Sequence, residues 1–70
     1  MGNWELHNKI KVHRAIKDLT QESLANKIGV TRKTINAIEN GRFVPSTILA
    51  IKLARFFGVK VEDLFELIEK

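Results

Sequence analysis

A three-residue link between two short amphipathic segments constrains the fold more than any other feature of this sequence. The segments are residues 21–28 and 32–40, and the link between them is Gly29-Val30-Thr31. Two helices can cross at a wide angle through so short a link when a glycine there adopts positive φ and a small residue, here Ala25, lies where the helices touch. We therefore predict two helices packed across a tight turn.

The second of these segments has one apolar side and one largely polar side. Ile35 and Ile38 are three positions apart, which places both on the same side of a helix. The major groove of DNA is wide enough for an α-helix and presents hydrogen-bonding groups on its base edges. The segment therefore has the pattern of a DNA-recognition helix, although its two cations also fit an ordinary solvated helix start. The outward residues are Arg32, Lys33, Asn36 and Ala37.

Three further helices are predicted, so the chain is expected to be all-α. They cover about Leu6–Asp18, the stretch between Pro45-Ser46 and Gly58, and about Val61–Ile68. Thr20 and Thr31 are expected to cap the two central helices through their hydroxyl oxygens. No run of residues favours strands, and the short connections predict a compact five-helix bundle in a single domain, residues 1–70. The expected core is Ile10, Leu24, Ala25, Ile28, Val30, Ile35, Ile38, Leu49, Leu53, Phe57, Val59 and Leu64.

The positive charge is concentrated in one part of the chain. The net charge is +4, and residues 1–42 alone hold eight Lys or Arg against four Asp or Glu. Such an asymmetry fits a surface that faces a polyanion, and it fits a solvated surface equally well. No stretch approaches the ~20 apolar residues of a membrane span, and we find no signal peptide or acylation motif. With no cysteine and no such motif, we expect a cytoplasmic protein without membrane contact.

Neither a metal site nor a catalytic site is expected. His7 and His13 are six positions apart, about 240° around a helix, so they would not share a face. His13 is expected to pack or hydrogen-bond near the base of the first helix instead. The acidic residues gather near the carboxyl end without a nucleophile or a phosphate-binding loop. We therefore predict no enzyme, no cofactor and no bound metal.

The segments around the turn resemble the phage repressor and Cro family, also called the xenobiotic-response-element (XRE) family of transcriptional regulators. The resemblance rests on residues 19–25 and 28–32, on residues 34–42 followed by Pro45-Ser46, and on residues 54–65. Together these cover about Ile10–Phe65. The resemblance implies a lambda-repressor-like DNA-binding domain, with the helix-turn-helix motif (residues 21–40) formed by the second and third helices.

The resemblance also implies roles for individual residues. Arg32, Lys33 and Asn36 would reach base edges, and Ala37 replaces the longer polar reader of many relatives, which implies an apolar contact there or none. Arg14 would pair with Glu39 beneath the DNA-facing surface. Contacts to the DNA backbone are implied for Gln21, Thr34, Asn40, Arg42 and Ser46, and less firmly for Lys9 and Lys17.

The function expected from this resemblance is sequence-specific binding of double-stranded DNA, with repression of transcription as its outcome. A homodimer would read a near-palindromic operator, since one helix reads few bases. We expect the interface in the last helix and tail, residues 60–70, with Phe65, Leu67 and Ile68, and we add Ile48 and Phe56 as further apolar candidates outside that segment. Trp4 either staples the first helix to the core or reaches a neighbouring subunit. The alternative is an interaction module of the same fold, an antitoxin or co-regulator that works through a protein partner.

Overall fold

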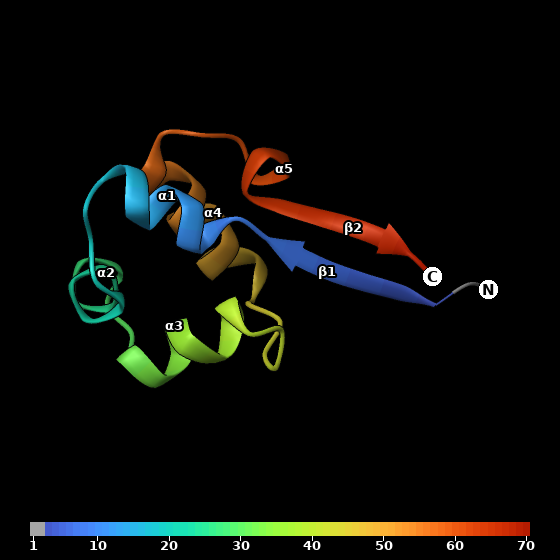
Figure 1. Cartoon of the computed structure of the whole chain (residues 1–70), viewed down its shortest axis with the longest axis horizontal. Helices are drawn as coiled ribbons and strands as arrows, with labels where there is room; N and C mark the ends of the chain where they lie inside the picture. The colour runs from blue at the N-terminus through green and yellow to red at the C-terminus, as the bar shows by residue number, and fades with distance from the viewer. Residues whose placement is uncertain (1–2) are drawn as a thin grey trace.

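The computed structural model describes residues 3–70, and over this range the chain forms five helices and two short strands (Figure 1). The five predicted helices are confirmed, but the all-α class is wrong, because both ends of the chain are extended. None of the helices described is long and apolar enough to cross a membrane. The elements are β1 (Trp4–Asn8), α1 (Ile10–Ile16), α2 (Gln21–Ile28), α3 (Arg32–Glu39), α4 (Thr47–Phe57), α5 (Val61–Leu64) and β2 (Phe65–Glu69).

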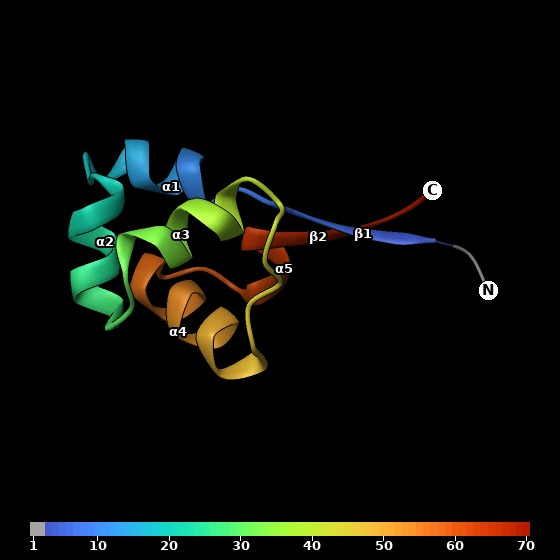
Figure 2. The ribbon, with the colours of Figure 1, turned by 90° about the horizontal axis from the view of Figure 1, so that it is seen from below.

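The two strands replace the outer parts of the first and last predicted helices. β1 and β2 pair antiparallel, with Leu6 opposite Leu67, and they project from the helices towards both chain ends (Figures 1 and 2). The amide of Lys9 donates to the carbonyl of Leu64 at 2.8 Å, and the amide of Lys70 donates to Asn3 at 2.7 Å. Each strand finds its hydrogen-bonding partner at the opposite end of the chain. Local helical patterns therefore led to the wrong assignment for both segments.

The core lies where the five helices meet and continues onto the first residue of β2. Nine of the predicted core residues are buried, and Val30, Leu49 and Val59 are partly buried. Ala54 and Phe65 are also buried, although neither was predicted to belong to the core. The buried apolar residues of the core are Ile10, Leu24, Ala25, Ile28, Ile35, Ile38, Leu53, Ala54, Phe57, Leu64 and Phe65. This core fixes the inner faces of α2 and α3.

Side-chain caps and a left-handed glycine set the ends of the central helices. The amide of Ser23 donates to Thr20 Oγ1 at 3.0 Å, and the amide of Thr34 donates to Thr31 Oγ1 at 3.2 Å. Gly29 ends α2 with φ of +88°, and its amide donates to the carbonyl of Ala25 at 2.8 Å. These contacts satisfy orphan groups of both helices within the predicted tight turn.

Replacing Gly29 with alanine is expected to lower the free energy of unfolding by about 1–2 kcal/mol, because an L residue is strained at this positive φ. A Cβ there would meet only Lys52 Nζ, at 4.0 Å, so the cost comes from the backbone and not from a clash. Urea unfolding followed by circular dichroism measures it. Asn26→Ala, at an exposed position of α2, is the control and should change stability little. Equal stability of Gly29→Ala and the wild type would contradict the prediction.

Candidate nucleic-acid interface

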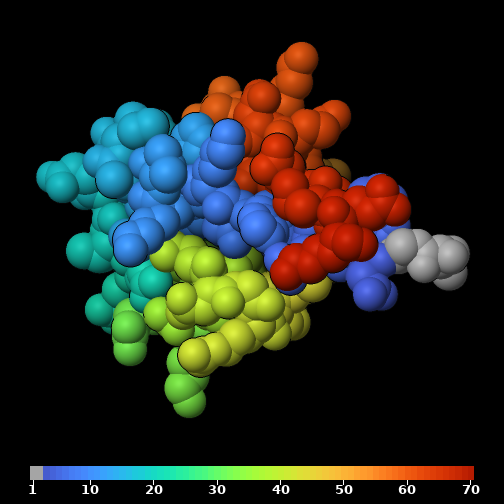
Figure 3. All heavy atoms as spheres, turned by 45° about the vertical axis from the view of Figure 1, so that its right-hand side comes forward, coloured from blue at the N-terminus to red at the C-terminus, as the bar shows by residue number. Residues whose placement is uncertain are grey.

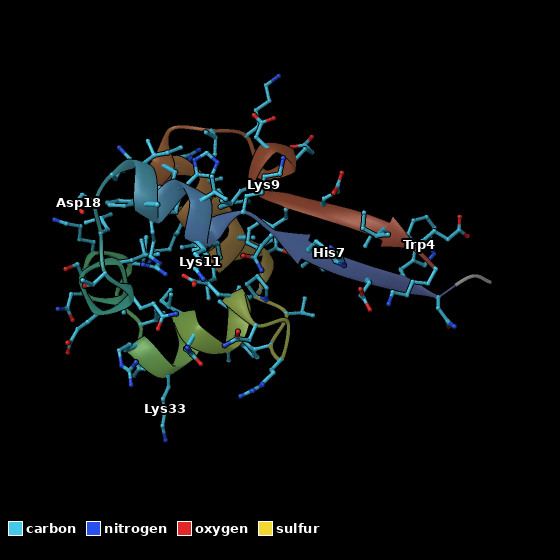
Figure 4. The ribbon with its side chains drawn as sticks, viewed as in Figure 1. Trp4, His7, Lys9, Lys11, Asp18 and Lys33 are labelled. Atoms are coloured by element: carbon cyan, nitrogen blue, oxygen red, sulfur yellow. The ribbon has the colours of Figure 1, made fainter. Side chains whose placement is uncertain are left out.

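The recognition helix predicted from sequence lies along one side of the molecule with its apolar face turned inward. Ile35 and Ile38 of α3 are completely or almost completely buried, and they hold the helix against the core. Arg32 and Lys33 are exposed in its first turn, and Lys33 points away from the body of the protein (Figure 4). α3 lies in front of α4 when the molecule is viewed from below (Figure 2). The outer face of α3 is therefore open to a partner.

The exposed cations around α3 have no carboxylate partners among the described residues. Within residues 3–70, the ion pairs join His7 to Glu5, Arg14 to Glu39 and Lys70 to Glu5. None of them involves Arg32, Lys33 or Arg42. These three side chains keep their positive charge uncompensated on one surface, which is the electrostatic requirement for contact with phosphates.

The pair between Arg14 and Glu39 anchors the C-terminal end of α3 to α1. Arg14 Nε donates to Glu39 Oε2 at 2.7 Å, and Nη2 donates to Oε1 at 3.1 Å. Arg14 Nη1 also donates to the carbonyl of Leu19 at 2.8 Å. The two side chains are only 15% and 6% exposed, and the hydrogen bonds to Glu39 raise the pKa of Arg14. The bidentate geometry fixes the angle between the two helices.

A chain of amide hydrogen bonds extends from this carboxylate to the outer surface. Gln21 Nε2 donates to Glu39 Oε1 at 3.1 Å, and Asn36 Nδ2 donates to Gln21 Oε1 at 3.3 Å. Asn40 Nδ2 then donates to Oδ1 of Asn36 at 3.1 Å and to its backbone carbonyl at 3.0 Å. Gln21, Asn36 and Asn40 are thus held in one network, the amide network, by the buried ion pair.

The amide network was not predicted from sequence. Its signal is present, because Glu39 and Asn40 follow Asn36 by three and four positions and therefore lie on the same side of α3 and its C-terminal end. Gln21 is far from them in sequence, and only the α2–α3 packing brings it within reach. The side-chain amides of Gln21 and Asn36 are already bonded to each other. These bonds use one N–H of each amide, so the second N–H can donate to DNA while the network holds the side chain in place.

Only some of the other residues predicted to contact DNA lie on α3 or next to it. Thr34, Asn36 and Ala37 are on α3 and are partly buried. Thr34 Oγ1 lies 3.1 Å from Thr31 Oγ1. Lys9 lies beside α5, above α1 in Figure 4, and not beside α3. The remaining residues are exposed: Lys17 at the end of α1, Arg42 just after α3, and Ser46, whose Oγ accepts a hydrogen bond from the amide of Leu49.

The residues predicted for a dimer interface differ widely in exposure. Phe65 is 8% exposed and packs in the core of its own chain, so it is corrected to a core residue. Phe56 is partly buried, where it packs against the core and its ring lies 5.2 Å from that of Phe57. Ile68 is also partly buried, whereas Ile48 on α4 and Leu67 on β2 are exposed.

The two histidines have different neighbours. His13 packs against the ring of Phe57, with the ring centroids 5.5 Å apart, as expected for a histidine near the base of α1. His7 lies on β1, where its Nε2 is 2.7 Å from Glu5 Oε1. Within the described part of the chain, no three His, Cys, Asp or Glu residues are grouped so as to hold a metal ion.

Replacing Gln21 with glutamate is expected to destabilise the fold by about 1–3 kcal/mol at neutral pH, because a carboxylate would face Glu39 Oε1 where an amide now donates. The repulsion raises the pKa of the new carboxyl in the folded state. Stability is therefore retained below its unfolded-state pKa and lost as the pH rises. Thermal unfolding at pH 4 and pH 7 measures this, with Glu22→Gln on the same turn as the control. A stability deficit that stays constant between these two pH values would argue against the contact.

The comparisons with known proteins agree with this geometry. A helix-turn-helix family model matches residues 10–64. An HTH-type transcriptional regulator of Methanocaldococcus jannaschii is 58% identical over 60 residues, which cover 86% of this chain and 91% of the relative. The cryptic phage CTXphi transcriptional repressor RstR of Vibrio cholerae is 42% identical over 57 residues, covering 81% of this chain and 51% of the relative.

A solved structure shares the fold over most of this chain. The restriction-modification controller protein C.AhdI of Aeromonas hydrophila superposes with a TM-score of 0.70 at 28% identity, over 77% of this chain and 78% of the other. The match to the family model and the similarity to these regulators cover both helices of the motif and the core that supports them. The chain therefore belongs to the XRE-type helix-turn-helix family of DNA-binding transcription regulators.

Proposed function

We propose that this protein binds a specific double-stranded DNA sequence with α3 in the major groove and represses transcription from that site. One observation carries the proposal: α3 buries its isoleucines and leaves Arg32 and Lys33 exposed without a carboxylate partner within residues 3–70. A helix with a buried apolar face and free donors on its other face fits the major groove. The similarity to a phage repressor supports repression as the outcome, since a protein bound at a promoter excludes the transcription machinery.

The proposed contacts fall into two groups with different consequences for recognition. Base contacts are assigned to Arg32, Lys33 and Asn36, with Ala37 against a thymine methyl group, because only base edges carry sequence information. Backbone contacts set the register of the protein on DNA and make binding salt-dependent. They are assigned to Gln21, Thr34, Asn40, Arg42 and Ser46, with Lys17 at the margin and Lys9 left out because it lies beside α5.

The proposed active species is a homodimer on a near-palindromic operator in the cytoplasm. α3 is eight residues long, and only its outward side chains reach bases. A single copy therefore reads too few base pairs to distinguish an operator from the rest of a genome. Two copies related by a two-fold axis would read half-sites about 34 Å apart, one turn of DNA. No chemical step is required, because occupancy of the site is the regulatory event.

The test is selection of duplexes from a random pool, followed by titration of the selected and scrambled sequences at two salt concentrations. We expect a selected near-palindrome, an affinity that falls steeply with salt, and a discrimination of at least about 10³-fold over scrambled DNA. A reporter gene placed behind the selected site should then lose expression when the protein is present. Binding without any preferred sequence would overturn the proposal and favour an antitoxin or co-regulator that acts through a protein partner.

A further inference from the structure

An open groove of about 580 Å³ lies along the outer edge of β1. Its walls are β1 on one side and, on the other, the C-terminal end of α3 with the loop that leads to α4. Buried residues, Ile38, Pro45 and Phe65, form its floor. Figure 3 shows β1, β2 and this loop on one face of the molecule. The groove therefore joins the end of the recognition helix to the terminal sheet.

The rim of the groove is apolar and exposed. Trp4 is 57% exposed, Phe43 48% and Val44 68%, and all three line the groove. Trp4 lies near the free end of the sheet (Figure 4). Two aromatic rings and a branched side chain left in water around one hollow are costly unless a partner covers them, and such exposed patches mark interaction sites.

The edge of β1 that faces the groove also has unused backbone groups. Lys9 bonds to Leu64 and Lys70 bonds to Asn3, and the two residues of each pair lie directly opposite each other. In an antiparallel ladder, hydrogen-bonded pairs alternate with pairs that form no hydrogen bonds to each other. The amides and carbonyls of Trp4, Leu6 and Asn8 therefore point away from β2. Over residues 3–70, β1 pairs with β2 alone. An uncovered strand edge is open to pairing with another chain.

The position of the groove fits the two-fold axis of a dimer on DNA. Half-sites about 34 Å apart place the axis about 17 Å from the middle of each recognition helix. α3 has eight residues and is about 12 Å long. Subtracting half of this length from about 17 Å leaves about 11 Å between the end of α3 and the axis. In Figure 1, β1 and the loop lie just beyond the C-terminal end of α3. With α3 along the line between the half-sites and its C-terminal end towards the axis, the groove would face the partner copy.

A second exposed apolar pair lies outside the groove. Val12 is 55% exposed and Ile16 73% exposed, both on α1. Neither residue lines the groove. Ile16 therefore provides a comparison of similar exposure for the rim.

We propose that the groove and its rim of Trp4, Phe43 and Val44 are the surface on which a second copy of this chain docks about a two-fold axis. Thirteen residues line the groove, whereas a standard interface has about 20–30 residues a side. We therefore expect a small interface and a weak dimer. The placement of the axis rests on the proposed function, but the dimer itself is tested without DNA.

The chain provides its own probe, because Trp4 is its one tryptophan. Sedimentation velocity and tryptophan emission are recorded over the same dilution series of the full chain. We expect a monomer–dimer equilibrium, with emission shifting to shorter wavelength as dimer forms and both signals sharing one midpoint. A dimer whose formation leaves the emission unchanged, or a chain that stays monomeric at high micromolar concentration, would overturn the proposal.

A matched pair of variants locates the surface. Val44→Asp places a charge on the rim, and Ile16→Asp places the same charge on a residue of similar exposure outside it. We expect Val44→Asp to raise the dimer dissociation constant by about tenfold or more, and Ile16→Asp to leave it unchanged, with both variants folded by circular dichroism. The reverse order, or a loss caused by Ile48→Asp instead, would place the interface elsewhere. Failure of DNA binding alone would contradict the proposed function but not this surface.

Discussion

Replacing Arg14 with leucine is expected to lower the free energy of unfolding by about 3 kcal/mol, a large share of the roughly 5 kcal/mol of a domain this small. The variant leaves Glu39, whose side chain is 6% exposed, as a charge without a counter-ion. It also removes the donor to the carbonyl of Leu19. Of the side chains that now hydrogen-bond the carboxylate, only Gln21 remains. Urea unfolding at neutral pH measures the loss.

Two companion variants separate a stranded charge from a lost side chain. Lys11→Leu also replaces a cation of α1 with leucine, but at an exposed position, and it should change stability by less than about 0.5 kcal/mol. Arg14→Leu combined with Glu39→Leu removes both charges, and it should recover part of the loss because no buried charge remains. If the double variant is less stable than Arg14→Leu alone, the cost does not come from the unpaired carboxylate.

The central part of the fold follows from local sequence signals. Thr20 and Thr31 cap α2 and α3 as predicted, and Gly29 adopts the positive φ that the tight turn requires. Each of these signals spans only a few residues, and the buried Ile35 and Ile38 follow from spacing alone. For this reason the amino-acid sequence is sufficient to predict the helix-turn-helix region in detail.

The ends of the chain could not be predicted in the same way. The segment Trp4–Asn8 forms hydrogen bonds with Phe65–Glu69, about sixty positions away, and neither strand is stable alone. Glu62 and Asp63 lie in the first turn of α5, where carboxylates complement the helix dipole, but α5 ends at Leu64 because Phe65 is extended, with φ of −123° and ψ of +136°. Because each strand pairs with a distant segment, neither segment contains a periodic pattern that reveals the pairing. Each shows only a short alternation of apolar and polar residues.

The site shows the same division between local and long-range information. The outward placement of Arg32 and Lys33 follows from helical spacing, whereas the amide network depends on how α2 packs against α3. The network gives Glu39 two functions, since its carboxylate holds Arg14 and also holds Gln21. The buried carboxylate of Glu39 therefore contributes both to the stability of the fold and to the orientation of the amides that face DNA. A substitution at Glu39 is expected to change both together.

Replacing Arg32 with alanine is expected to weaken binding to the selected operator by about 10–100-fold, since a guanidinium that reads a guanine contributes about 1–3 kcal/mol of discrimination. Arg32 is exposed and makes no ion pair within residues 3–70, so the thermal stability should not change. The diagnostic result is a loss of preference at one base pair of each half-site. Titrations of the operator and of its single-base variants measure it.

Two other arginines provide the matched comparisons for Arg32. Arg42→Ala removes a proposed phosphate contact, and it should weaken binding to every sequence equally and reduce the salt dependence by about one unit of slope per half-site. Arg55→Ala removes an exposed cation from the last turn of α4, outside the proposed interface, and should leave the affinity nearly unchanged. If all three variants lose affinity equally and none alters base preference, α3 contributes only charge, and the bases are read by another part of the chain.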